Sequence, residues 1–117
     1  MDIQALRVAL SDFARERDWD QFHSPKNLSM ALAGEAAELL EIFQWLTEQQ
    51  SNEIVNSEKK LGQVKEEIAD VFIYLVRLSD KLNIDIERAV LDKMALNAKK
   101  YPIEASKGNA VKYNRRE

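Results

Sequence analysis

Apolar residues recur every three or four positions along most of the chain, and this spacing predicts amphipathic helices. The series that starts at Ile3 and continues through Phe13 predicts a first helix over residues 3–17. Residues 19–25 break the pattern, because the residue before Pro25 avoids helical backbone angles. The chain is therefore expected to begin with a helix followed by a short irregular segment.

Three further helices follow from the same periodicity and from polar residues that can cap them. They are predicted over residues 27–46, 58–82 and 86–100. Ser57 and Asp85 stand directly before the last two, where a side-chain oxygen can accept a hydrogen bond from the first turn. Residues 47–56 between the helices are predicted to form a polar loop.

Four helices joined by short links predict an all-α fold, a four-helix bundle. With 117 residues, three Gly and two Pro, the chain has room for one domain and too few turns for a β-sandwich or barrel. We expect this domain to occupy residues 1–102. Residues 103–117 form a polar, basic tail that is expected to order only against a partner or a ligand.

Composition narrows the chemistry that the chain can perform. No cysteine is present, which excludes disulfides, thiolate zinc sites and cysteine nucleophiles, and His23 is the single histidine. The net charge of −3 divides into −7 over residues 1–98 and +4 over residues 99–117, and an acidic body of this kind is a poor ligand for duplex DNA. The sequence shows neither a signal segment nor a membrane span of about 18 apolar residues, so we expect a cytoplasmic location and no membrane partner.

Carboxylates interrupt the apolar faces of two predicted helices. Glu35 takes one position in a stripe whose other members are Leu28, Leu32, Leu39 and Ile42. Glu38 lies one turn further along the same face. Glu67 and Asp70 repeat this arrangement in a stripe whose other members are Val64, Val71, Tyr74 and Leu78. Two helices thus each present an acidic pair from a face that should pack against the core.

The spacing of these pairs carries no weight by itself, because about three such pairs are expected by chance among 20 acidic residues, and three occur. Their place on apolar faces is informative, because an unpaired ionised carboxylate in a core costs several kcal/mol. The carboxylates either bind a metal ion or lie at a partly solvated bundle end or in buried ion pairs. Carboxylates without cysteine favour a hard cation, Mg²⁺ or Mn²⁺ as its substitute, with ligand positions left open for substrate phosphates.

The same residues resemble a known family signature. The chain is similar to the Glu-x-x-Glu and Glu-x-x-Asp motifs of MazG-like, all-α nucleoside triphosphate pyrophosphohydrolases in Gly34-Glu35-Ala36-Ala37-Glu38 and Glu67-Ile68-Ala69-Asp70. Further matching segments follow the family order along most of the chain: Arg17-Asp18-Trp19-Asp20-Gln21-Phe22-His23, Phe43-Gln44-Trp45, Asp70-Val71-Phe72-Ile73-Tyr74-Leu75, Lys93-Met94 and Asn97-Ala98-Lys99-Lys100-Tyr101-Pro102. Within the family, the chain most resembles the single-domain dCTP pyrophosphatase branch.

The resemblance implies an Mg²⁺-dependent enzyme that cleaves dCTP or a related dNTP between its α and β phosphates. The products would be the monophosphate and pyrophosphate, and the role would be house-cleaning of the nucleotide pool. The metal ligands implied by the resemblance are Glu35, Glu38, Glu67 and Asp70. A metal-activated water would attack the α-phosphorus, with Glu38 as the general base and Glu41 as the alternative.

The resemblance also implies a site for the nucleotide. The residues that would hold the base are Trp19, His23, Trp45 and Tyr74. From helical periodicity alone, Trp45 and Tyr74 are instead core residues. The residues that would hold the triphosphate share one helix face: Lys93, Asn97 and Lys100. The alternative interpretation is that this face is charged and solvated, without a ligand. In the basic tail, Lys112 and Tyr113 match the family loosely, and a solvated tail is the favoured interpretation.

Two further features bear on specificity and assembly. Members of this family can offer a histidine from the first helix toward the base, and the aligned residue here is Leu10, so we do not expect strict cytosine selectivity. Family members assemble as dimers of dimers. Because the helices over 27–46 and 58–82 are apolar nearly all round, we expect a homotetramer with sites near subunit contacts, and a homodimer as the minimum.

Two other functions compete with this one. The first is a non-catalytic helical interaction module whose carboxylates pair with Arg77, Lys65 or Lys81, and its melting temperature would not respond to metal. The second is a hydrolase of another phosphoanhydride substrate, which would keep the metal ligands but would not need Trp19 for base stacking.

Overall fold

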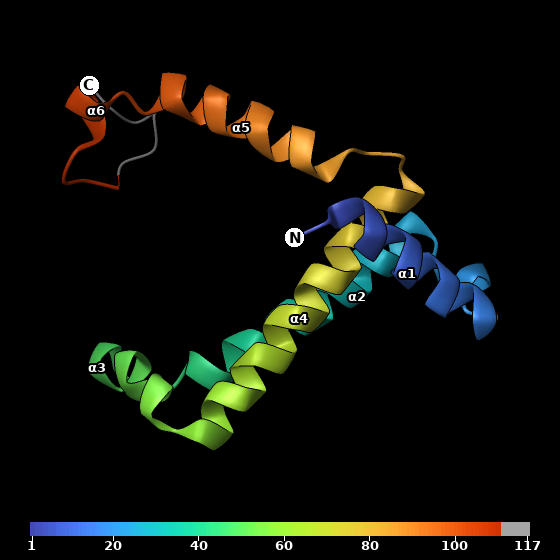
Figure 1. Cartoon of the computed structure of the whole chain (residues 1–117). Helices are drawn as coiled ribbons and strands as arrows, with labels where there is room; N and C mark the ends of the chain where they lie inside the picture. The colour runs from blue at the N-terminus through green and yellow to red at the C-terminus, as the bar shows by residue number, and fades with distance from the viewer. Residues whose placement is uncertain (111–117) are drawn as a thin grey trace. The chain divides into compact units, whose positions relative to one another are not determined.

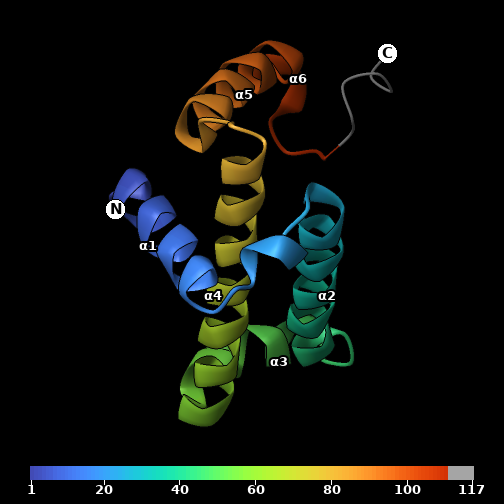
Figure 2. The ribbon, with the colours of Figure 1, turned by 90° about the vertical axis from the view of Figure 1, so that its right-hand side faces the viewer.

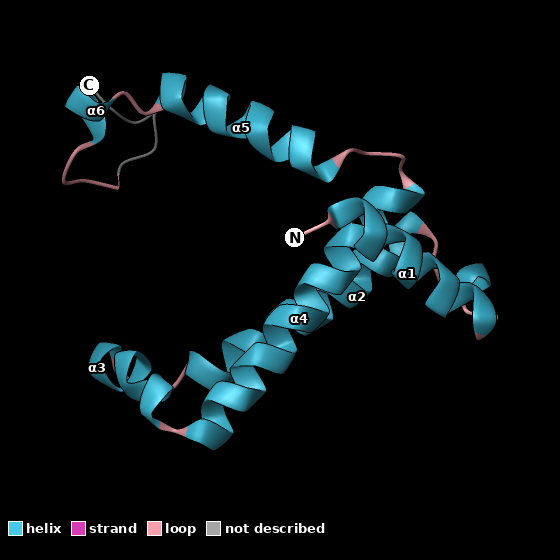
Figure 3. Cartoon of the chain, viewed as in Figure 1, coloured by secondary structure: helices cyan, strands magenta, loops and turns pink. Residues whose placement is uncertain are grey.

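The computed structural model describes residues 1–110, and within this range it consists of helices, turns and loops without a strand (Figure 1, Figure 3). The helices are α1 (Ile3–Glu16), α2 (Pro25–Phe43), α3 (Glu48–Asn52), α4 (Glu58–Lys81), α5 (Ile86–Lys100) and α6 (Ile103–Ser106), with two 3₁₀ turns, η1 (Asp20–Phe22) and η2 (Glu53–Asn56). The predicted all-α class is confirmed. None of the described helices combines the length and the apolar character needed to span a membrane.

Side-chain caps explain where the long helices begin. Ser57 and Asp85 each accept a hydrogen bond from a backbone N–H group in the first turn of α4 and α5, so both predicted N-caps are confirmed. α2 begins at Pro25, earlier than predicted, because proline is tolerated in the first turn of a helix and Ser24 provides the cap.

The predicted helix ends need correction, most of all around residues 47–56. α1, α2 and α4 all end earlier than predicted, and α2 stops at Phe43. The expected polar loop contains α3 and η2. Thr47 and Gln50 form a reciprocal capping box, in which each side chain accepts a hydrogen bond from the other residue's backbone N–H, at 3.1 Å and 2.9 Å. This pair starts a new helix directly after α2. The basic tail likewise contains a short helix, α6.

The chain divides into two units, residues 1–84 and the residues from 85 onward. In the first unit, α2 and α4 lie side by side, and α1 packs against α4 (Figure 2). The second unit contains α5 and α6. Because α5 belongs to this second unit, the closed bundle of four helices stays a prediction.

The core of the first unit is small. Its buried apolar side chains are Ala14, Leu28, Ile54, Val64 and Val76. Large apolar side chains stay exposed on both long helices, with exposed fractions from 36% to 59%: Met30 and Leu40 on α2, Ile68 and Leu75 on α4. The packing of the first unit therefore leaves these apolar side chains in contact with water.

Candidate active site

Three carboxylates meet where α2 and α4 lie side by side. Glu35 and Glu38 lie one turn apart on α2, and Glu67 lies on α4. One oxygen atom of each lies within 4.8 Å of the other two. Glu35 and Glu67 are half-buried whereas Glu38 is exposed, so the cluster is partly shielded from water.

The electrostatics of this cluster favour a bound cation. The Glu35 Oε2 and Glu67 Oε2 atoms are buried and have no hydrogen-bond partner among the described residues. Burial, followed by the negative charge of Glu38, raises the pKa of Glu35 above its usual value and raises the pKa of Glu67 to about 7. A divalent cation would supply the missing partner and the missing positive charge. Because all the donors are carboxylate oxygens, the site fits Mg²⁺ or Mn²⁺.

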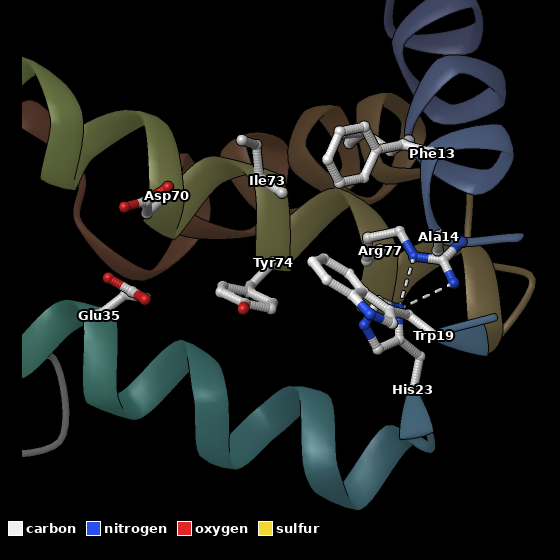
Figure 4. A pocket seen from close by; sticks show the side chains of 10 residues that line it. Phe13, Ala14, Trp19, His23, Glu35, Asp70, Ile73, Tyr74 and Arg77 are labelled. Carbon is white, nitrogen blue, oxygen red and sulfur yellow. Dashed lines mark hydrogen bonds between the residues drawn. The ribbon is translucent and has the colours of Figure 1, made fainter. Parts of the chain in front are cut away.

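The fourth predicted ligand adjoins the cluster. Asp70 lies one turn after Glu67 on α4, and its carboxyl group faces that of Glu35 across the space between the two helices (Figure 4). Asp70 and Glu35 line the same cavity. Glu41 is exposed and belongs neither to the cluster nor to the cavity lining in the described chain. Three of the four predicted metal ligands thus form the cluster, Asp70 adjoins it through the cavity lining, and Glu41 belongs to neither.

A cavity of about 270 Å³ extends from these carboxylates toward α1. Glu35 and Asp70 line its acidic end, and Trp19, His23 and Tyr74 line an aromatic end (Figure 4). The volume is close to the lower end of the range for small-molecule sites, about 300 Å³. The cavity therefore offers a ligand one surface for stacking and one for coordination.

Side chains from α1 complete the aromatic end. Leu10 lines the cavity. Trp19 and Phe13 pack edge to face with ring centroids 5.8 Å apart, and the Arg17 guanidinium lies 3.5 Å from the Phe13 ring centroid. Trp19 is 46% exposed and Phe13 is 48% exposed. An aromatic pair that is packed on one side and open on the other is suited to stacking with a planar ligand.

Arg77 belongs to the site although sequence reasoning did not place it there. Its side chain is 3% exposed and bonds Asp20, Asp80 and the ring of His23. Lys81, followed by Arg77, holds the pKa of Asp20 below its usual value. The one signal in the sequence is the helical register, which puts Arg77 one turn after Tyr74 at the end of an apolar run.

The ion pairs of the described chain bear on the interaction-module hypothesis. That hypothesis pairs the acidic cluster with Arg77, Lys65 or Lys81. In residues 1–110, the ion pairs of Arg77 and Lys81 go to Asp20 and Asp80. The cluster carboxylates have no ion pair within that range, so a salt-bridge role for them finds no support there.

The other predicted site residues either do not line this cavity, belong to the second unit or fall outside the described residues. Trp45 follows α2 and is 87% exposed, so the hypothesis that it is a core residue is wrong, and it does not line the cavity. The residues predicted to hold the triphosphate lie at helical spacing on α5, in the second unit: Lys93, Asn97 and Lys100. Lys112 and Tyr113 lie outside the described residues.

The chain is similar to proteins of one known family. The MazG-like family model matches residues 31–115. Curated relatives include dCTP pyrophosphatase 1 of Rattus norvegicus, 42% identical over 111 residues, and dCTP pyrophosphatase 1 of Homo sapiens, 40% identical over 111 residues. Each alignment covers 95% of this chain and 65% of the relative, so the chain spans slightly less than two-thirds of the length of these proteins.

A solved structure extends the comparison to the fold. It is the crystal structure of a pyrophosphatase from Archaeoglobus fulgidus, with a TM-score of 0.80 and 43% sequence identity, covering 87% of this chain and 94% of that chain. The family model spans both acidic pairs, whereas Trp19 and His23 precede it. From the matched region, the identity to these relatives and the shared fold, we conclude that the chain belongs to the MazG-like family.

Proposed function

We propose that the chain is an Mg²⁺-dependent pyrophosphohydrolase that cleaves dCTP or a related dNTP between its α and β phosphates. The observation that carries the proposal is the cavity that joins an aromatic end to a carboxylate end. A nucleobase stacks on aromatic rings, whereas anionic phosphates approach carboxylates only with a cation between them. Relatives named dCTP pyrophosphatase 1 support the same reaction class.

The acidic residues have different roles at the carboxylate end of the cavity. Glu35, Glu38 and Glu67 would hold the metal, with Asp70 beside them. Bound Mg²⁺ neutralises phosphate charge and activates water for attack on phosphorus. Glu38 is the exposed member of the cluster, which makes it the best placed to accept a proton from that water. Glu41 is the weaker choice because it lies outside the cluster.

The reaction is tested with a panel of canonical and methylated triphosphates in the presence and absence of Mg²⁺. We expect monophosphate and pyrophosphate on ion-exchange chromatography, only with metal. Glu38→Gln should lower kcat by at least about a hundredfold, and Glu41→Gln, which removes the same charge outside the cluster, should have little effect.

Three outcomes would contradict the proposal. Release of orthophosphate that continues in the Glu38→Gln variant would exclude this reaction. Cleavage of another phosphoanhydride but no nucleotide would move the chain to a different substrate class. No turnover, together with a melting temperature that metal does not change, would favour the interaction module.

We propose a dimer of dimers as the assembly. The exposed apolar side chains of α2 and α4 support it, because Met30, Leu40 and Ile68 have no contact in the first unit that removes them from water. Light scattering after size exclusion should give four times the chain mass of 13.5 kDa. A mass of two chains would exclude the tetramer and leave the homodimer as the assembly. A monomer at micromolar concentration would contradict both.

A further inference from the structure

The ring of His23 contacts a buried arginine at the aromatic end of the cavity. Nε and Nη2 of Arg77 lie 3.3 Å and 3.1 Å from Nδ1 of His23, and only 3% of the Arg77 side chain is exposed. An arginine carries donors and no acceptor, so Nδ1 must accept these hydrogen bonds and cannot carry a proton. A neutral imidazole with an unprotonated Nδ1 carries its proton on Nε2.

Ion pairs on two sides hold the guanidinium in this position. Asp20 Oδ1 lies 3.1 Å from Nη2 of Arg77, and Asp80 Oδ2 lies 3.5 Å from Nη1. Each carboxylate has a second cation, since Lys81 Nζ lies 2.6 Å from Asp20 and Arg7 Nη1 lies 2.8 Å from Asp80. Partners other than the histidine therefore fix the place of Arg77.

These surroundings keep His23 uncharged near neutral pH. Burial, followed by the positive charge of Arg77, lowers the pKa of His23, while the charge of Asp20 opposes this and that of Lys81 adds to it. The other ionisable side chains around the network and the cavity are Asp80, Arg7, Glu35, Asp70 and Tyr74. Protonation of Nδ1 would place an N–H group against the guanidinium and break both hydrogen bonds.

We propose that Arg77 is a positioning residue that fixes His23 as its neutral Nε2–H form, so that His23 donates a hydrogen bond to an acceptor on the bound base. His23 lines the cavity with Trp19 and Tyr74 (Figure 4), and its ring hydrogen bonds in the described chain both lie on Nδ1. That leaves Nε2–H for a ligand. Such a donor selects a ring nitrogen or carbonyl oxygen over an amino group at the same place on the base. The nucleobase as ligand rests on the proposed function, whereas the state of the histidine does not.

The single histidine of the chain makes its state directly measurable. Long-range proton–nitrogen NMR spectra of the ligand-free, isotope-labelled protein should show an unprotonated Nδ1 and a protonated Nε2 at neutral pH, with a titration midpoint below that of an unperturbed histidine. Arg77→Met should raise the midpoint and mix the two neutral tautomers. Arg77→Lys keeps the charge and should keep the wild-type tautomer. Arg15→Met is the matched control, because it removes an exposed guanidinium from α1 outside this network.

Two spectroscopic results would overturn the inference. The first is a wild-type spectrum with a protonated Nδ1 or with mixed tautomers, and this result needs no variant. The second is a folded Arg77→Met protein, verified by its melting curve, that retains the wild-type midpoint and tautomer.

Kinetics with the dNTP panel tests the contact with the base. Arg77→Met should raise KM by about twofold or more, because the apparent affinity falls with the fraction of His23 that still carries its proton on Nε2, with kcat within about twofold of the wild type. A fall in kcat at unchanged KM would refute a role in base binding. If the wild type hydrolyses no dNTP, the base contact fails with the proposed function, while the spectra still decide whether Arg77 fixes the tautomer.

Discussion

Metal binding should weaken as the pH falls below neutrality, because Glu67 must lose a proton when a cation binds. Burial, followed by the charge of Glu38, raises the pKa of Glu67 to about 7, and a carboxylate must be ionised to act as a ligand. With one displaced proton, the ionised fraction and the apparent affinity for Mg²⁺ both fall by about tenfold from about pH 8 to about pH 6. If Glu35, whose pKa is also raised, loses its proton in the same step, the fall is steeper.

Isothermal titration calorimetry over this pH range measures the affinity, and a comparison of buffers with different ionisation enthalpies counts the released protons. Glu67→Gln removes one ligand and one titrating group, so it should bind Mg²⁺ more weakly than the wild type at every pH and release fewer protons. Glu66→Gln is the matched control, because Glu66 is the exposed neighbour on α4 with the same charge. Unchanged wild-type affinity across the range, or a Glu67→Gln protein that binds like the wild type, would refute the reasoning.

The same pKa predicts the stability of the metal-free protein. A carboxyl group whose folded pKa of about 7 exceeds the reference value of 4.5 contributes its full stability below about pH 4.5 and loses it as the pH rises through about 7. Relative to Glu67→Gln, the metal-free wild type should therefore lose Tm between about pH 4.5 and about pH 7, and Mg²⁺ should restore it at the higher pH. Melting curves by circular dichroism provide the measurement. A wild-type Tm that rises over this range relative to the variant would contradict the assigned cause.

Further predictions concern packing, capping and stacking. Leu28→Ala should lower the free energy of unfolding by about 2–5 kcal/mol in urea denaturation, because Leu28 is 1% exposed, whereas Met30→Ala, at a position 59% exposed, should cost less than about 1 kcal/mol. Ser57→Ala removes the N-cap of α4 and should cost about 1 kcal/mol in the same assay. Trp19→Ala should weaken base binding by about 1–3 kcal/mol, measured as a rise in KM for dNTPs at nearly unchanged Tm, and an unchanged KM would remove Trp19 from the site.

Helices and their N-caps could be predicted because both depend on residues within one or two turns of each other. Ser57 and Asp85 satisfy N–H groups in the adjacent turn, and the apolar series defines which face is buried. The end of α2 could not be predicted from apolar periodicity, because Leu46 continues the series while the capping box at Thr47 starts a new helix. Where an apolar series and a capping signal overlap, their relative strength decides where the helix ends. The hydrophobic pattern alone does not give this relative strength.

The acidic end of the site could be predicted from local sequence signals, whereas the ion pair beside the aromatic end could not. Glu35 and Glu67 were recognisable because a carboxylate in an apolar stripe is unfavourable unless something binds it. No such conflict marks Asp20, which lies in a polar segment, and its bond to Arg77 joins positions 57 residues apart. This pair becomes visible only when η1 and α4 are placed together.

The distribution of charge around His23 shows why specificity is harder to predict than metal binding. The charge of Arg77 lowers the pKa of this histidine, whereas the charge of Asp20 raises it, so the two partners act in opposite directions on one ring. A relative with the same histidine but without the arginine would present a different hydrogen-bonding pattern to the base. If Arg77 fixes the tautomer as proposed, the preferred base depends on the residue one turn after Tyr74 as well as on the histidine itself.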